Sequence, residues 1–97
     1  REVGAYMLKK MARLPHVAEA RGRGLLVGCE YDLPIAVEVK HEVLNRHALI
    51  TAIGDKVNRM IPPLTVTKKQ VDDLMEILKE SIGAAAKKYY EKGQKSA

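Results

Sequence analysis

Apolar and polar positions repeat along this chain with two periods, which predict different elements. In residues 2–13, apolar side chains recur three and four positions apart, the spacing of an amphipathic helix. The same period returns in residues 34–46 and again from residue 67 to about residue 90. Thr67 and Gln70 have the spacing of a capping box at the start of the last segment. The pattern therefore predicts three helices.

Shorter apolar runs predict strands. Residues 25–31 are apolar apart from Glu30 and indicate a buried central strand. Residues 48–53 and 57–61 are apolar runs on either side of the short segment Gly54-Asp55-Lys56. Two such runs joined by a short glycine-containing turn are typical of a β-hairpin. The sequence thus places a hairpin between the second and third helices.

The segment before residue 25 is harder to assign. Residues 16–19 indicate the entry to a strand, and Arg21-Gly22-Arg23-Gly24 predicts a turn or kink, because glycine adopts positive φ without a Cβ clash. The resulting order is helix, strand pair or bent strand, helix, hairpin, helix. We expect an α+β fold of two layers, with a small, mostly antiparallel sheet of three to four strands and helices packed on one face. The other face would be free to meet another domain.

Arg59 is the charged residue within the apolar run 57–61. If its side chain points the same way as the apolar ends of this run, the guanidinium is buried, and a buried arginine needs an anion to meet it. The alternative is a structural arginine at a strand edge that reaches water or pairs with Glu30 or Asp55. The dipeptide Pro62-Pro63 cannot donate ladder hydrogen bonds, so the strand should end there.

The composition limits the class of protein. A chain of 97 residues suits one small domain, and no apolar run approaches the ~20 residues that span a bilayer, which argues against a membrane protein. The sequence begins with Arg1 and shows no secretory signal, so we expect a piece from the C-terminal side of a longer protein. Its single cysteine, Cys29, cannot form an internal disulfide, which favours a cytoplasmic protein.

Charge gathers near the C-terminus. Residues 87–97 hold four lysines against one glutamate and so account for +3 of the net charge of +5. We interpret residues 1–90 as the domain and residues 91–97 as a basic, frayed tail. The alternative is a stand-alone basic interaction module for nucleic acid that uses this tail with Arg21 and Arg23. Aromatic residues are not interleaved with basic ones as an RNA-stacking platform requires, so we do not favour nucleic acid as a partner.

Other chemically active side chains show no pattern of a site. His16, His41 and His47 lack the spacing of metal ligands, and one cysteine adds too little for a zinc site. Cys29, in a predicted buried strand, is expected to behave as a small hydrophobic residue. We therefore predict no metal and no catalytic residue on this chain.

Two motifs together resemble a known family. RGRGLLVGCEY at residues 21–31 and ALITAIGDKVNRMIPPLTVTKKQVD at residues 48–72 are similar to the C-terminal small domain of class-III pyridoxal-phosphate-dependent aminotransferases, most of all to the acetylornithine aminotransferase group. Two positions depart from the family pattern, since Ala48 stands where glycine is usual and Cys29 replaces an aliphatic residue. Within the two motifs, we expect a structural role, and no contact with substrate or cofactor, for Arg21, Gly22, Gly24, Pro62 and Pro63.

The resemblance implies a function for Arg59, which matches the arginine that binds the α-carboxylate of the amino-acid substrate. It implies a small domain packed beside a large pyridoxal-phosphate-binding domain of the same chain, in a homodimer that moves an amino group from N-acetylornithine to 2-oxoglutarate. No residue here matches the family's cofactor motifs, so we expect this chain to bind no pyridoxal phosphate and to be inactive alone. Ornithine, succinylornithine and 4-aminobutyrate aminotransferases are alternatives within the family.

Overall fold

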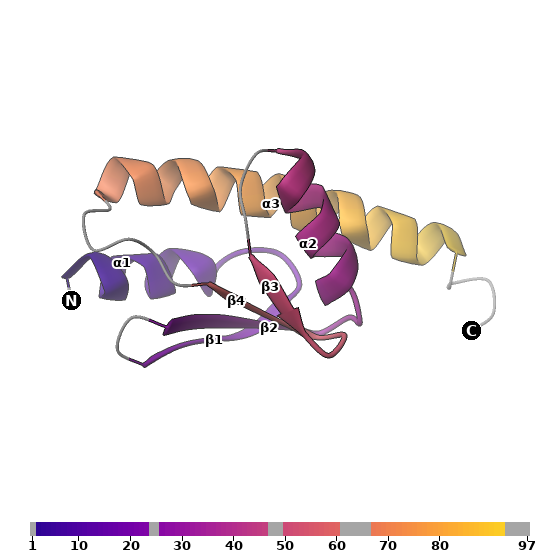
Figure 1. Ribbon diagram of the computed structural model, residues 1–97, viewed down its shortest axis with the longest axis horizontal. Helices are drawn as coiled ribbons and strands as arrows, with labels where there is room; N and C mark the ends of the chain where they lie inside the picture. Colours follow the sequence, from indigo (N-terminus) through magenta and orange to yellow (C-terminus); the bar gives the residue numbers. More distant parts are fainter. Residues whose placement is uncertain (1, 24–25, 47–49, 61–66, 93–97) are drawn as a thin grey trace.

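The computed structural model describes residues 2–23, 26–46, 50–60 and 67–92, and the account below concerns these ranges. In Figure 1, all the labelled helices lie on one side of the sheet. None of the described helices is long and apolar enough to cross a membrane. The elements follow in the order α1 (Glu2–Met11), β1 (Val17–Arg23), β2 (Leu26–Tyr31), α2 (Ala36–Asn45), β3 (Thr51–Ile53), β4 (Val57–Met60) and α3 (Lys68–Lys92).

The strands form one antiparallel sheet in the order β1-β2-β4-β3. Helix α1 packs against β1, α2 packs against β3 and β4, and α3 lies across α1 and α2 (Figure 1). The predicted α+β architecture, with helices on one face of a small antiparallel sheet, is confirmed. Both β2 and β4 are interior strands, so Arg59 does not lie at an edge of the sheet, although its side chain is exposed to water as that alternative expected.

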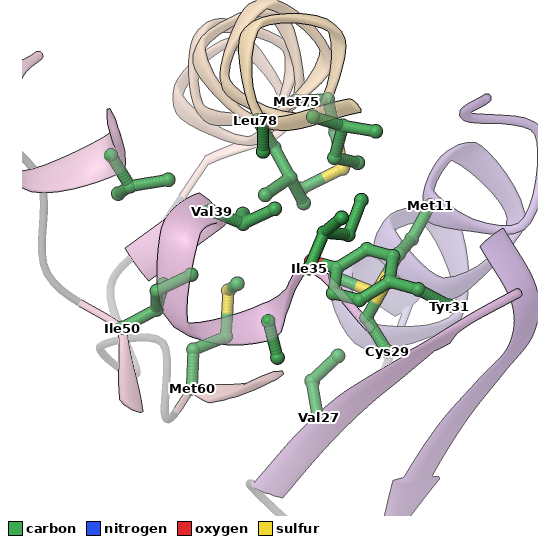
Figure 2. Close-up of a cluster of buried hydrophobic side chains, with 14 of the residues drawn as sticks. Met11, Val27, Cys29, Tyr31, Ile35, Val39, Ile50, Met60, Met75 and Leu78 are labelled. Atoms are coloured by element: carbon green, nitrogen blue, oxygen red, sulfur yellow. The ribbon is translucent and has the colours of Figure 1, made fainter. Parts of the chain in front are cut away.

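The core fills the space between the sheet and the helices. Along β2 the buried residues are Val27, Cys29 and Tyr31, which alternate with more accessible ones because successive side chains of a strand point to opposite faces. In Figure 2 they face Val39 of α2 and Leu78 of α3. Burying each large apolar side chain contributes about 1.5–3 kcal/mol, so this cluster holds the helices on the sheet.

Helix α3 starts where the capping pattern predicts. The Gln70 amide N–H donates to Thr67 Oγ1 at 3.1 Å, and the Thr67 amide N–H donates to Gln70 Oε1 at 2.9 Å. Both halves of the capping box are thus formed. The helix continues to Lys92, beyond the boundary expected near residue 90. Residues 93–97, most of the predicted frayed tail, lie outside the described part.

The predicted turn at Arg21-Gly22-Arg23 is wrong. These residues belong to β1, which pairs with β2 up to its last residue, opposite Leu26. A Cβ added to Gly22 would lie 2.9 Å from Leu8 Cδ1, closer than real Cβ atoms come to a neighbour. Glycine at this position allows α1 to approach the sheet closely, which the sequence pattern alone did not distinguish from a turn. Gly24 lies outside the described residues.

The predicted hairpin is confirmed over its described part. Gly54 has φ of 68°, a conformation that glycine adopts without strain. The turn is held to the rest of the fold by two backbone hydrogen bonds, from Ala36 N–H to Asp55 O at 2.9 Å and from Tyr31 N–H to Lys56 O at 2.8 Å. The hairpin is therefore fixed to the start of α2 and the end of β2. Ala48, Ile61 and the Pro62-Pro63 dipeptide lie outside the described residues.

Candidate functional site

Arg59 lies on the open face of the sheet. Its neighbours Asn58 and Met60 are buried on the helix-covered face, whereas the Arg59 side chain is exposed on the opposite face. The expectation of a buried arginine is therefore wrong. The reason is the phase of the strand: Asn58 faces the core instead of Val57, because its amide finds hydrogen-bond partners there. Because Arg59 is exposed, the fold does not need an anion to neutralise it. Any role of Arg59 must therefore come from binding a group that approaches the open face of the sheet.

The open face brings the two sequence motifs together. In the cross-strand pairing, Gly28 of β2 lies between Arg21 of β1 and Arg59 of β4. A hollow of about 320 Å³ occupies this place, and we call it the sheet hollow. Its lining residues are Arg21, Gly22, Leu26, Gly28, Val57 and Arg59.

Gly28 forms the middle of the sheet hollow. A Cβ added there would meet only the backbone oxygens of Asn58 and Arg21, at 3.9 and 4.0 Å, which are ordinary contact distances. The backbone would thus accept a side chain at this position without a clash. Its absence leaves the space between the two arginines open.

The two arginines differ in the charges around them. Arg21 Nη1 lies 2.8 Å from Glu19 Oε1, and Arg21 Nη2 lies 3.2 Å from Glu30 Oε1. Glu19 and Glu30 raise the pKa of Arg21, the Coulombic attraction of Glu19 being the largest cause. Within the described ranges, Arg59 has no ion pair and no side-chain hydrogen bond. Arg59 therefore lines the hollow without a carboxylate partner among the described residues, whereas the charge of Arg21 is compensated.

The pairing of Arg59 with Glu30 or Asp55, considered from the sequence, is not formed. Glu30 pairs with Arg21 instead, and Asp55 is exposed in the hairpin turn. The compensation of Arg21 also weakens the view of this segment as part of a basic interaction module, because a phosphate would have to compete with two carboxylates for its guanidinium.

Sequence reasoning missed a buried polar group directly beside Arg59. The side chain of Asn58 is 1% exposed and receives a hydrogen bond from the Tyr31 hydroxyl at 2.5 Å. Asn58 Nδ2 donates to Ala36 O at 3.1 Å and to Thr51 O at 3.2 Å. The available signal was an asparagine that shares its strand face with Met60, in a run otherwise apolar apart from Arg59.

The remaining candidates are scattered. Cys29 is 1% exposed, and burial raises the pKa of its thiol to about 11, so it stays a thiol at neutral pH, as expected of a small core residue. His16 Nδ1 lies 3.1 Å from Asp32 Oδ1, and His41 is exposed on α2. His47 lies outside the described residues. In the described part of the chain, no three metal-binding side chains are grouped.

The sequence matches the class-III aminotransferase family over residues 1–82. The chain belongs to the class-III aminotransferase family. Acetylornithine aminotransferase of Caldanaerobacter subterraneus subsp. tengcongensis is 44% identical to it over 62 residues, which cover 64% of this chain and 16% of the relative. Acetylornithine aminotransferase of Methanosarcina acetivorans is 35% identical over 83 residues, covering 84% and 21%. Ornithine aminotransferase of Staphylococcus carnosus is 36% identical over 85 residues, covering 82% and 20%.

Solved structures agree with this assignment. Ornithine aminotransferase of Plasmodium yoelii superposes with a TM-score of 0.75 at 26% identity, over 87% of this chain and 24% of that one. A transaminase from ancestral reconstruction superposes with a TM-score of 0.77 at 26% identity, over 90% and 23%. This class-III aminotransferase chain spans about a fifth of the length of the curated relatives it matches.

Class-III aminotransferases depend on pyridoxal phosphate, and a chain that holds this cofactor needs a suitable lysine. The cofactor is bound through a lysine, and a lysine suited to covalent chemistry is buried or close to another cation. None of the described lysines is buried. Lys10 and Lys88 pair with carboxylates that raise their pKa values, the opposite of what a nucleophilic amine needs. The described part of the chain therefore does not fit the cofactor by itself.

Proposed function

We propose that this chain supplies the carboxylate-binding arginine, Arg59, of a pyridoxal-phosphate-dependent aminotransferase of the acetylornithine type. The observation that carries the proposal is an arginine on an interior strand that lines the sheet hollow and has no carboxylate partner among the described residues. The predominance of acetylornithine aminotransferases among its relatives supports the substrate class. The reaction we propose moves an amino group from N-acetylornithine to 2-oxoglutarate.

The chemistry of the guanidinium suits this role. Arginine is planar, remains charged at all relevant pH values and can donate two parallel N–H bonds to one carboxylate. Because Arg59 sits on a strand between two others, its backbone is held while its side chain remains accessible. The residue would orient the substrate by its carboxylate. Pyridoxal phosphate, when bound elsewhere in the whole protein, would supply the electron sink for the transfer.

We infer that the open face of the sheet meets a large cofactor-binding domain of the same protein. This face carries Arg59 and the partly exposed apolar side chains of Leu26, Val57 and Ile53, so covering it buries apolar surface and brings Arg59 next to the cofactor domain. A homodimeric assembly and a cytoplasmic location stay predictions, as does the inactivity of this chain alone.

The amino donor distinguishes this proposal from the alternatives within the family. A relative that is an ornithine aminotransferase is 36% identical, so ornithine is a specific competitor, and succinylornithine and 4-aminobutyrate remain as further candidates. Initial rates of the full-length protein with each donor and 2-oxoglutarate would decide among them. We expect the highest kcat/KM with N-acetylornithine.

The test of Arg59 is its replacement by lysine in the full-length protein. Arg59→Lys keeps the charge but loses the paired donors, so the KM for the amino donor should rise about 10- to 100-fold, as expected from the ~1.5–3 kcal/mol of a charged hydrogen bond. The absorbance of bound pyridoxal phosphate should remain. Arg46→Lys is the matched control and should leave KM unchanged, because Arg46, at the C-cap of α2, pairs with Glu42 and Glu80 and does not line the sheet hollow. An unchanged KM in Arg59→Lys would refute the proposal.

A further inference from the structure

Asn58 is the buried polar side chain that directly precedes Arg59. It lies on the core face of β4 and is 1% exposed. Its Nδ2 donates to the carbonyl oxygens of Ala36 and Thr51, at 3.1 and 3.2 Å, and its Oδ1 accepts from the Tyr31 hydroxyl at 2.5 Å. These bonds connect β4 with α2, β3 and β2. One side chain thus joins four elements.

The orientation of this amide is fixed by the chemistry of its partners. Carbonyl oxygens can only accept, so the Nδ2 group must face Ala36 and Thr51, which leaves Oδ1 toward Tyr31. Burial raises the pKa of Tyr31, whose hydroxyl therefore keeps its proton and remains a donor. Both N–H groups of the amide and its oxygen are satisfied. An alternative position of the side chain would leave buried polar groups without partners.

This network opposes a shift of β4 in register. A slip by one residue would reverse the two faces of the strand, turning Asn58 toward the open face and Arg59 into the core. The short β4, Val57–Met60, carries few apolar side chains to oppose such a slip. The three bonds of Asn58 exist only in the observed register. Thr51 Oγ1, which donates to Arg59 O at 3.2 Å, holds the next peptide unit from the neighbouring strand.

We propose that Asn58 is a positioning residue. Together with Tyr31, it fixes the register of β4, so that Arg59 is presented at the sheet hollow in the orientation that binds a carboxylate. An aliphatic side chain would fill the same core position without a hydrogen bond, so the amide is not needed for apolar packing. Its contribution is to select one arrangement of the strand. This inference rests on the proposed carboxylate role of Arg59.

The test uses the full-length protein loaded with pyridoxal phosphate and two variants of the network. Asn58→Leu removes all three bonds, and Tyr31→Phe removes one while keeping the ring. Displacement of a binding group by about 1 Å can reduce rates by up to ~100-fold, so the KM for N-acetylornithine should rise roughly tenfold in Asn58→Leu and less in Tyr31→Phe. With N-acetylputrescine, the same amine without its α-carboxylate, neither variant should change kcat/KM.

A double-mutant cycle separates positioning from general damage. In the Arg59→Lys background, Asn58→Leu should raise KM no further, because the group that it positions is already altered. Leu78→Ala in α3, a buried apolar core site that makes none of the network's hydrogen bonds, is the control for lost stability and should leave kcat/KM with both donors unchanged.

Three outcomes would overturn the inference. One is a normal KM for N-acetylornithine in both network variants, and another is an equal loss with both donors, which indicates a merely structural role. The third is an increase of KM in the double variant equal to the product of the increases caused by Asn58→Leu and by Arg59→Lys alone. If Arg59→Lys alone leaves KM unchanged, the proposed function itself fails, so the two failures are distinguishable.

Discussion

Replacement of Gly28 offers a test in which the stability of the fold should increase while the binding of the substrate becomes weaker. Replacing it with alanine adds one methyl group to the middle of the sheet hollow, between Arg21 and Arg59. The added Cβ would meet only two backbone oxygens, at 3.9 and 4.0 Å, so no atom must move. The change therefore alters the shape of the hollow while leaving the fold intact.

The two expected magnitudes follow from these contacts. Glycine inside a strand is less favourable than alanine by roughly 0.5–1 kcal/mol, because it loses more backbone freedom on folding. Since no clash opposes the new methyl group, Gly28→Ala should stabilise the chain by about this amount. The same methyl group takes space beside Arg59 that the substrate carboxylate would occupy. Displacement of a bound substrate by about 1 Å can reduce a rate by up to ~100-fold. We expect KM for the amino donor to rise by about tenfold.

Urea unfolding of this 97-residue chain measures the first effect, and initial rates of the full-length protein measure the second. Two other glycines provide matched controls. Gly83→Ala, on the exposed side of α3 with nothing within 4 Å of the new Cβ, should stabilise by about 1 kcal/mol without changing KM. Gly22→Ala places its Cβ 2.9 Å from Leu8 Cδ1, so Leu8 must move and the gain in stability should be reduced or lost.

A Gly28→Ala variant that gains stability and keeps a normal KM would refute the reasoning. It would mean that the carboxylate does not approach Arg59 through the sheet hollow, even if Arg59→Lys impairs binding. A loss of stability in Gly28→Ala would contradict the contact distances instead. Comparison with Gly83→Ala distinguishes these results from a general effect of removing a glycine.

Two further predictions concern the helices. Thr67→Ala removes the acceptor for the Gln70 amide N–H and should lower the unfolding free energy of the chain by about 1 kcal/mol, measured by urea unfolding with helical circular dichroism. Glu42, hydrogen-bonded by Lys88 and Arg46, has a lowered pKa, with Lys88 as the largest cause. Its charge should therefore stabilise the fold above its ordinary pKa, and this stabilisation should be lost as the pH falls through the lowered value. Glu42→Gln should cost roughly 1 kcal/mol at pH 7, with the difference from the unchanged protein vanishing in acid; a pH-independent difference would contradict the linkage.

The elements that could be predicted depend on residues close together in the sequence. The capping box needs only Thr67 and Gln70, three positions apart, and the hairpin needs a glycine between two apolar runs. The buried stripe of α3 repeats within single turns. Such signals are local, so the sequence determines them before any tertiary contact is known. The general architecture follows because helices with one apolar stripe need a sheet face to cover.

The direction of Arg59 could not be predicted in the same way. Both faces of β4 hold an apolar residue, Val57 on one and Met60 on the other, so the period of two fits either phase. The phase of the strand is set by Asn58. Its amide can be buried in the core because the hydroxyl of Tyr31, 27 residues earlier in the chain, donates a hydrogen bond to it there. Gly22 is a similar case, since its need for glycine comes from Leu8 of α1.

The exposure of Arg59 changes what its role requires. An ion pair between exposed groups in water is worth only about 0–1 kcal/mol, so the sheet hollow by itself should hold a carboxylate weakly. The same pair becomes much stronger when a low-dielectric cover excludes water. No described element of this chain covers the open face of the sheet. The chain spans about a fifth of the length of its relatives. Tight recognition by Arg59 therefore needs a second surface, and the proposed cofactor domain is the part that would bring both the cover and the reacting group.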